Sequence, residues 1–372
     1  MKILYVTTIS LTMNSFFKPH IEMLIREGHS VDLACNFKDL PPDALYSELG
    51  CGIYQIDFSR NPISVDNVKA YSQLKRVVES GGYDIVHCHT PNAAVITRLV
   101  CRTFRKNNGL KVFYTAHGFH FYKGAPKLNW ILFYPVEKFC SRFTDKLITI
   151  NKEDYELAKA KFWAKDVCCV PGVGIDLSGF ENVQVDRKAK RCEMGVPEGA
   201  FLLLSVGELN ENKNHQVIIK ALARLKNPHV HYAIAGTGPN AAHLEQLAKK
   251  LGVDGQVHLL GYRKDIPELN YTADVFCFPS IREGLGLAAI EAMACGKPVI
   301  AASNRGTNEF VIPGKNGFLC ECHDDEAFAA AIGNLISDNE MRVRFSGETQ
   351  ASVQRFRVDC VLDVMKGMYK EI

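Results

Sequence analysis

One segment in the C-terminal half limits the fold more than any other part of the sequence. Apolar runs at 274–278 and 299–302 predict two buried strands, and a helix between them is expected to begin near Gly286 and to end before Gly296. The order is therefore strand, glycine-containing loop, helix, strand. A unit of this kind belongs in a parallel sheet that is covered by helices.

The loop of this segment has the features of an anion site. The first amides of a helix lack intrahelical partners, and glycines allow a ligand to approach the backbone closely. Carboxylates at Glu283 and Glu291 flank the helix start and are suited to hold hydroxyl groups. The alternative is that Glu283 only caps the helix and Glu291 is solvated. The amides expected to bind the anion belong to Gly284, Leu285, Gly286 and Leu287.

The same alternation of strands and helices runs through both halves of the chain. It predicts an α/β fold of two Rossmann-like, doubly wound domains that face a central cleft. We expect an N-terminal domain at 1–175 and a C-terminal domain at 198–354, with a last helix at about 355–372 that packs back on the first domain. Further strands are predicted at 3–6, 31–35, 84–87, 112–115, 146–150, 167–171, 201–206, 231–235 and 257–260, and a loop at 7–15.

Composition excludes several classes of protein. The 372 residues are 47% hydrophobic and 23% charged, which is ordinary for a globular chain. No apolar run reaches the ~18 residues of a membrane span, and the start shows no signal peptide. Thirteen scattered cysteines indicate a reducing cytoplasm, and no group of them predicts a metal site. A net charge of +3, with the excess of basic residues in 1–175, does not favour nucleic acid.

The spacing of Glu283 and Glu291, with Pro279-Ser280 before it and 294–299 after it, resembles the Glu-seven-Glu motif of glycosyltransferase family 4. The likeness extends over nearly the whole chain and is greatest to the branch that makes capsules and exopolysaccharides. It implies the GT-B fold and a retaining transfer of sugar from a nucleotide diphosphate, expected to be UDP, to an acceptor hydroxyl. It also implies no cofactor and no metal. Glu283 would contact the sugar near the reacting carbon, and Glu291 the ribose.

Further donor residues follow from the same resemblance. His117 would contact the donor sugar, and Lys213 matches the second of two basic residues that bind the diphosphate in the family. Glu208 stands where the first basic residue is usual, so it must point away or pair with Lys213. Tyr262 and Arg263, at the end of a predicted strand, are expected near the base.

The acceptor side is expected in the first half, at Asn14, Ser15, His87 and His89. The acceptor would be a saccharide, most simply a lipid-linked one. A basic, aromatic stretch at 123–138 and a run from Arg98 to Lys106 would let the protein lie on anionic lipid at the inner face of the cell membrane. A buried aromatic helix with lysines reaching to solvent explains the first stretch equally well.

Two other functions are compatible with these residues. A UDP-sugar epimerase of the same fold would need no acceptor, and a non-catalytic partner protein would explain Glu208. A dinucleotide fingerprint at Gly236-Thr237-Gly238 would indicate an oxidoreductase, but alanine replaces its third glycine and no acid ends the following strand. The sequence leaves open which sugar, acceptor and linkage are used, and the oligomeric state.

Overall fold

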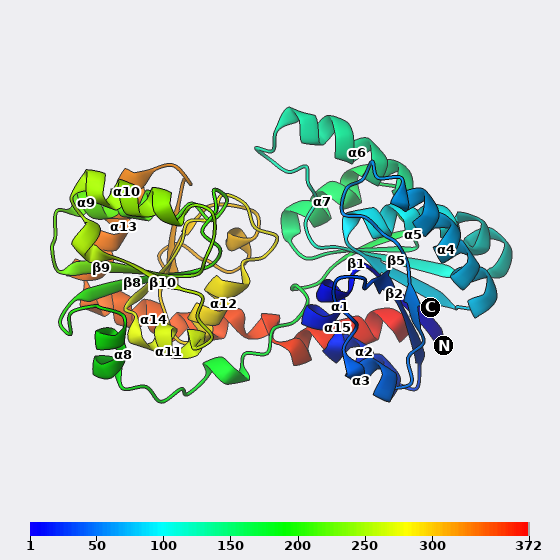
Figure 1. Ribbon diagram of the computed structural model, residues 1–372, viewed down its shortest axis with the longest axis horizontal. Helices are drawn as coiled ribbons and strands as arrows, with labels where there is room; N and C mark the ends of the chain where they lie inside the picture. The colour runs from blue at the N-terminus through cyan, green and yellow to red at the C-terminus, as the bar shows by residue number, and fades with distance from the viewer. Residues whose placement is uncertain (371–372) are drawn as a thin grey trace. The chain divides into compact units, whose positions relative to one another are not determined.

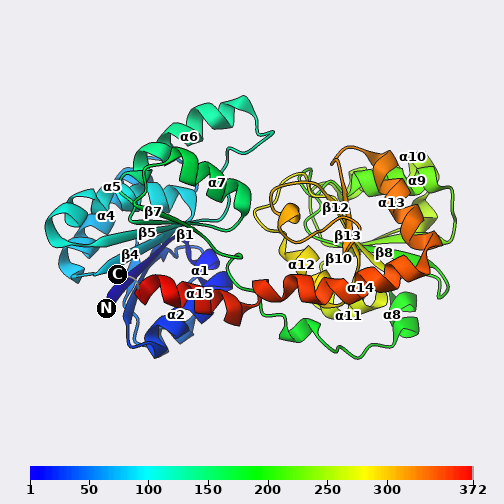
Figure 2. The ribbon, with the colours of Figure 1, turned by 180° about the vertical axis from the view of Figure 1, so that it is seen from behind.

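A computed structural model describes residues 1–370 of the chain, in two compact units (Figures 1 and 2). The N-terminal unit comprises residues 1–174 together with the C-terminal segment from Val358, and the second unit comprises Ile175–Arg357. The sequence placed the domains at 1–175 and 198–354, with the last helix added to the first. Residues 371–372 of that predicted helix lie outside the described residues.

Within residues 1–370, the N-terminal unit is built on a seven-stranded parallel sheet of order β3-β2-β1-β4-β5-β6-β7. Its strands are β1 (Lys2–Ile9), β2 (Ser30–Asn36), β3 (Ile53–Gln55), β4 (Ile85–His89), β5 (Lys111–Ala116), β6 (Lys146–Thr149) and β7 (Asp166–Cys169). Its helices are α1 (Ser10–Phe16), α2 (Lys18–Arg26), α3 (Ala44–Glu48), α4 (Asp66–Gly81), α5 (Pro91–Asn108), α6 (Lys127–Ser141), α7 (Lys152–Lys161) and α15 (Val358–Lys370).

The second unit has the same plan. Its described sheet has six parallel strands in the order β10-β9-β8-β11-β12-β13. The strands are β8 (Phe201–Val206), β9 (Val230–Ala235), β10 (Val257–Gly261), β11 (Val275–Phe278), β12 (Val299–Ala302) and β13 (Gly317–Cys320). The helices are α8 (Arg187–Glu193), α9 (Gln216–Leu225), α10 (Ala241–Leu251), α11 (Ile266–Thr272), α12 (Leu287–Ala294), α13 (Asp325–Ser337) and α14 (Asn339–Val353).

Burial explains why the central strands appear in the sequence as continuous runs of apolar residues. Every residue of β11 and of β12 is buried, because helices cover both faces of the sheet. The short edge strand β3 is only half-buried, and its three residues show no such run. The sequence consequently predicted the central strands and missed this one.

The predicted loop at 7–15 is wrong. β1 continues to Ile9, and the next seven residues form α1. The segment has no glycine to interrupt regular structure, and buried Met13 anchors it, with its carbonyl oxygen accepting a hydrogen bond of 2.8 Å from the Tyr46 hydroxyl.

The C-terminal helix α15 is part of the N-terminal unit and packs against α2. Lys370 Nζ lies 3.3 Å from a carboxylate oxygen of Glu27, and Lys366 pairs with the other oxygen. Tyr369 is buried, and its hydroxyl lies 3.2 Å from that of Tyr5 in β1. The end of the chain thus contributes to the core that its beginning forms.

Candidate functional site

Two loops at the carboxyl edge of the second sheet are joined by hydrogen bonds. β8 pairs directly with β11, so the loops that follow these strands are neighbours. Ile281 donates its amide to the carbonyl oxygen of Asn212 at 2.8 Å, and the Asn212 side chain donates to the carbonyl oxygen of Arg282 at 3.0 Å. The loop after β8 is thereby held against the loop that leads to α12.

This contact brings Lys213 and Glu283 together. The Lys213 ammonium donates to Glu283 Oε1 at 2.7 Å, and it lies 5.3 Å from the centre of the Phe278 ring. Both side chains are partly exposed, at 23% and 15%. The pair is therefore close enough to the surface for a ligand to reach it.

The amides that lead into α12 are free of protein partners. In residues 1–370, no acceptor is recorded for the backbone N–H groups of Gly284 to Leu287, and no side chain caps the helix. Gly286 has a φ of 106°, and a Cβ there would lie 2.9 Å from the Phe278 ring. The turn that presents these amides therefore requires glycine.

Glu291 lies in α12, one turn further along. Burial raises the pKa of its carboxyl group to about 7. Among the described residues its carboxylate has no hydrogen-bond or ion-pair partner, and desolvation is the one cause of the pKa shift. A half-buried carboxylate without a partner is costly unless a ligand donates hydrogen bonds to it.

Glu208 does not take the lysine. Its carboxylate accepts a hydrogen bond of 2.9 Å from Asn210 at the exposed surface of the loop, whereas Lys213 pairs with Glu283. Of the two arrangements that the sequence allowed for Glu208, pairing with Lys213 is therefore wrong.

The glycine fingerprint after β9 has a structural explanation. A Cβ on Gly236 would lie 1.9 Å from the carbonyl oxygen of Gly207, and one on Gly238 would lie 2.5 Å from that of Leu209. The glycines let the turn after β9 pack on the loop after β8. They require no dinucleotide to account for them.

The sequence analysis did not identify the residues that contact Glu283 from the loop after β12. Gly306 leaves no room for a side chain, since a Cβ there would lie 2.9 Å from Glu283 Cβ. The buried Arg305 contacts the Glu283 carbonyl oxygen through Nε at 3.4 Å. The only signal in the sequence was the pattern Asn304-Arg305-Gly306, which by itself does not indicate what it touches.

The two residues expected near the base differ in whether protein groups already hold their side chains. Tyr262 is 73% exposed and available to a ligand. Arg263 lies between Asp265, at 2.7 Å from Nε, and Glu193, and these hydrogen bonds raise the pKa of its guanidinium. Held by two carboxylates, Arg263 is better explained as a structural residue.

In the N-terminal unit, His117 and His89 form a pair at the ends of β5 and β4. Their Nε2 and Nδ1 atoms lie 3.2 Å apart, so one of them donates and the other accepts. His89 stacks on Tyr5, and its Nε2 is buried without a partner among the described residues. Burial, with a smaller effect from His20, lowers the pKa of His117 to about 4, so its ring is neutral near pH 7.

The other expected acceptor-side residues have protein partners or lie at the surface. Both ring nitrogens of the fully buried His87 are used, by Tyr369 and by Thr115 at 2.8 Å, which leaves none for an acceptor. Asn14 is bonded at both ends of its amide, to the backbone of Pro41 and of Asp43. Only Ser15 is exposed, on α1. The expectation for His87 is therefore wrong, because it is fully buried with both ring nitrogens in use, whereas the expectation for Asn14 and Ser15 stays a prediction.

One residue of the predicted basic surface is not at the surface at all. Arg98 is fully buried in α5, where it donates to Glu137 of α6 at 2.8 Å and lies 4.2 Å from the centre of the Tyr114 ring. A guanidinium with these two partners can be buried, as an isolated charge cannot. Its inclusion in the lipid-facing run was therefore wrong.

Residues 1–370 lack two kinds of feature. No helix there is both long and apolar enough to cross a membrane. No cluster of three or more His, Cys, Asp or Glu side chains there has the arrangement of a metal site.

Comparison with known proteins agrees with this architecture. Residues 2–151 match the family described as "Glycosyl transferase 4-like", and residues 186–351 match "Glycosyl transferases group 1". EpsD of Bacillus subtilis (strain 168), which is named as a glycosyltransferase, is 38% identical over 99% of this chain and 96% of its own.

Two further relatives cover almost the same span. The Escherichia coli UDP-Gal:alpha-D-GlcNAc-diphosphoundecaprenol alpha-1,3-galactosyltransferase is 26% identical over 94% of this chain and 90% of its own. The crystal structure of Anabaena HepE in complex with UDP superposes with a TM-score of 0.80 at 23% identity and covers 100% of both chains. The chain therefore belongs to the group 1, family 4-like glycosyltransferases and has their GT-B fold.

Proposed function

We propose that this glycosyltransferase moves a sugar from a UDP-sugar, with retention of configuration, to a hydroxyl of a lipid-linked saccharide during exopolysaccharide or capsule synthesis. The observation that carries the proposal is the Lys213–Glu283 pair, 2.7 Å apart, beside unpartnered amides at the start of α12. Cation, amides and carboxylates occur together at one sheet edge, as recognition of a sugar diphosphate requires.

Each group has a definite part in this proposal. The Lys213 ammonium and the amides of Gly284 to Leu287 bind the diphosphate and stabilise the negative charge that grows on it as the sugar leaves. Such fixed donors make a metal unnecessary. Glu283 binds sugar hydroxyls, and Glu291 accepts from the ribose. The sugar is attacked from the face that the diphosphate leaves. The contact of His117 with the donor sugar stays a prediction.

The donor and acceptor classes are supported by relatives. The Escherichia coli relative is named for UDP-Gal and for an acceptor carried on diphosphoundecaprenol, and the HepE crystal structure contains UDP. We infer the same classes for this chain. Retention follows from the family resemblance alone.

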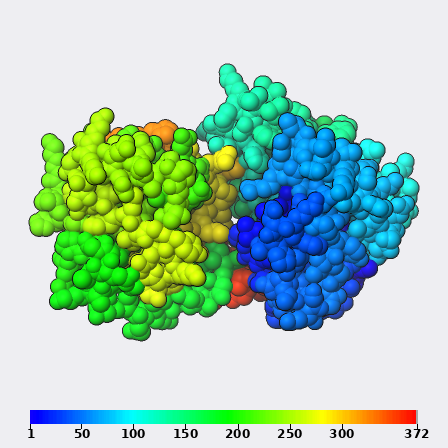
Figure 3. Space-filling model, viewed as in Figure 1, coloured from blue at the N-terminus to red at the C-terminus, as the bar shows by residue number. Residues whose placement is uncertain are grey.

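We further propose that the protein works in the cytoplasm and binds the membrane peripherally through α6. This helix lies at the periphery of its unit (Figures 1 and 3). It exposes Leu128 and Ile131, at 61% and 68%, among lysines. Its other side packs Trp130 and Tyr134 on the core, as the alternative of a buried aromatic helix predicted for this stretch. Exposed apolar groups beside cations suit an anionic lipid surface.

The test is a transfer reaction without added metal, in the presence of EDTA. A set of UDP-sugars is first screened for thermal stabilisation of the protein, and the best is incubated with an undecaprenyl-diphosphate-linked acceptor. The glycosidic configuration of the product is then read by NMR. We expect UDP release coupled to an α-linked product from an α-linked donor.

Three results would contradict this proposal. An inverted linkage would overturn retention, and a free epimerised sugar formed without acceptor would make the protein an epimerase. Failure of every nucleotide sugar to bind in calorimetry would make it a non-catalytic member of the fold.

A further inference from the structure

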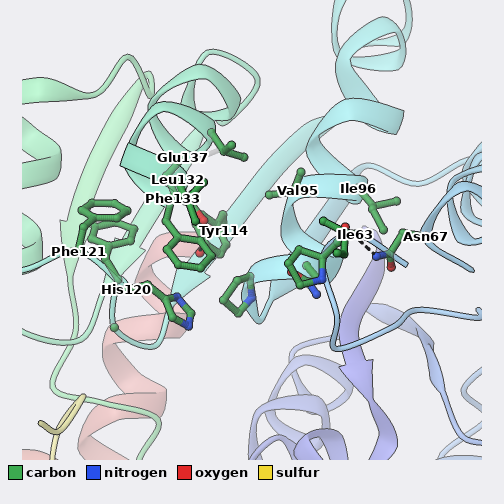
Figure 4. Close-up of a pocket in the computed structure, with 16 residues that line it drawn as sticks. Ile63, Asn67, Val95, Ile96, Tyr114, His120, Phe121, Leu132, Phe133 and Glu137 are labelled. Carbon is green, nitrogen blue, oxygen red and sulfur yellow. Dashed lines mark hydrogen bonds between the residues drawn. The ribbon is translucent and has the colours of Figure 1, made fainter. Parts of the chain in front are cut away.

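A cavity of about 380 Å³ lies in the N-terminal unit between α5, α6 and the segment before α4 (Figure 4). Figure 4 shows Phe121 and Phe133 on one side, with Ile63 and Val95 on the other. The cavity is within the usual size range of a small-molecule site. No residue of the proposed donor site lines it.

The walls are mainly apolar, and the charge of their one carboxylate is neutralised. Glu137, the one ionisable carboxylate of the lining, is paired with Arg98 at 2.8 Å and accepts from the Tyr114 hydroxyl at 3.2 Å. No lysine or arginine lines the cavity. A nucleotide or a free sugar would replace few of the hydrogen bonds to water that it loses among the apolar walls, whereas a hydrocarbon would lose none.

The rim of the cavity is apolar and exposed. Ile63 is 88% exposed, Leu132 53% and Val136 44%, although all three line the cavity. Outside them on α6 lie Leu128 and Ile131, which are exposed as well. The cavity therefore opens onto the apolar face of α6, so a chain could enter it without crossing a polar surface.

A second, polar pocket of about 350 Å³ is continuous with the cavity. The two share Pro62, Pro91, Asn92, His120 and Phe133 as lining residues. The polar pocket adds hydroxyls near the carboxyl ends of two strands, from Thr8 in the last residues of β1 and from Thr90 directly after β4, and the exposed cation Arg60. In this fold such strand ends are where ligands bind. A cation beside an apolar cavity fits a ligand with an anionic head and a hydrocarbon tail.

We propose that the apolar cavity binds the isoprenoid chain of a polyprenyl-diphosphate-linked acceptor, and that the polar pocket with Arg60 takes its diphosphate. This inference rests on the proposed function, because it specifies the acceptor of that reaction. It assigns a place to the lipid itself and makes chain length a determinant of acceptor affinity.

The experiment uses calorimetry of the full chain with inorganic diphosphate and with dimethylallyl, geranyl and farnesyl diphosphates below their aggregation limits. Each methylene that is buried raises affinity by about fourfold. We expect farnesyl diphosphate to bind at least tenfold more tightly than the five-carbon compound. Equal affinity for all four probes would overturn the proposal.

Two matched tryptophan variants locate the effect. Val95→Trp fills the cavity from α5, whereas Val343→Trp adds the same ring to an exposed position of α14 in the second unit, outside the lining. We expect V95W to lose at least tenfold in affinity for farnesyl diphosphate and to keep its affinity for inorganic diphosphate. V343W should match the wild type with both probes. Leu132→Asn, at a partly exposed position of the cavity wall, should also weaken the binding of farnesyl diphosphate. This variant tests the cavity independently if V95W does not fold.

Other results would contradict either the lipid site or the proposed donor, and the measurements tell these two failures apart. If V95W and L132N both bind farnesyl diphosphate like the wild type, the cavity is not the lipid site. If dihexanoyl phosphatidylglycerol displaces farnesyl diphosphate at equal concentration, the occupant is a membrane lipid, and the proposal fails. Absence of UDP binding by the wild type would contradict the proposed donor instead, and it is measured in a separate titration.

Discussion

The two units share one plan, but the carboxyl edges of their sheets carry opposite kinds of chemistry. In the second unit the edge holds ions and unpartnered amides, with Lys213 and Glu283 partly exposed. In the N-terminal unit it holds neutral rings such as the buried His89 and the half-buried His117. The Arg98–Glu137 ion pair of that unit is buried beside an apolar cavity, which Glu137 helps to line. The difference indicates which ligand each edge is suited to bind.

Charge placement explains this division. A cation or carboxylate that stays partly solvated can exchange its protein partner for a phosphate or a hydroxyl, whereas a fully buried pair cannot be broken without a large loss. The second unit is thus suited to the anionic donor that we propose. The N-terminal unit buries the Arg98–Glu137 pair beside its apolar cavity, and the cation that stays exposed next to that cavity is Arg60.

The largest expected effect comes from the buried pair. Arg98→Met leaves Glu137 buried without its cation and should lower the free energy of unfolding by about 3–5 kcal/mol, measured by urea denaturation. The double variant Arg98→Met with Glu137→Leu should recover most of the loss. A single variant as stable as the wild type would contradict the contrast between the two edges.

The next effect concerns Glu291, whose folded pKa of about 7 lies above its ordinary value of 4.5. A raised carboxyl pKa means that stability falls as pH rises from about 4.5 through 7, so Glu291→Gln should stabilise the protein by up to about 3 kcal/mol at pH 8 and not at pH 4. Melting curves at both pH values measure this. An equal effect at both would show that the carboxyl is not desolvated.

The same substitution should act in the opposite direction on the ligand. The ionised carboxylate accepts hydrogen bonds from hydroxyls, so the UDP affinity of the wild type should fall as pH drops below about 7. The Glu291→Gln variant is the control, because its pH dependence reports only the ionisation of UDP and of the other groups of the protein. Parallel pH profiles of the two proteins in calorimetry would remove Glu291 from the donor site.

Lys213→Ala should weaken UDP binding by about 10- to 100-fold, the range for loss of a charge-assisted hydrogen bond to a phosphate. The exposed Lys220→Ala on α9 is the matched control and should bind UDP normally. If both variants bind alike, the second unit's edge does not recognise the diphosphate through this cation.

The smallest effect is expected at the membrane. Leu128→Asn with Ile131→Asn removes two exposed apolar groups from α6 and should reduce flotation with anionic vesicles severalfold, because burial of apolar surface drives interfacial binding. Neutral vesicles serve as the control. Undiminished flotation of the variant would exclude α6 as the membrane contact.

Much of the architecture could be predicted because each buried parallel strand appears in the sequence as a short, continuous run of apolar residues. The run at 201–206 was predicted with the bounds that β8 has, and the run at 274–278 begins one residue before β11 and ends with it. The helix expected from near Gly286 begins at Leu287. The prediction failed where local signals were weak or ambiguous, at the half-buried edge strand β3 and at the helix α1, which had been taken for a loop.

The sequence by itself determined the alternation of elements, the glycine that α12 needs at its start and the acids on either side of it, since these depend on backbone conformation and local hydrophobic periodicity. Only the tertiary structure decided which charges meet. Lys213 reaches Glu283 because β8 and β11 are neighbours, and Arg98 is buried because Glu137 on the next helix neutralises it. Such pairings join residues far apart in the chain, and their energy depends on burial, which no local pattern records.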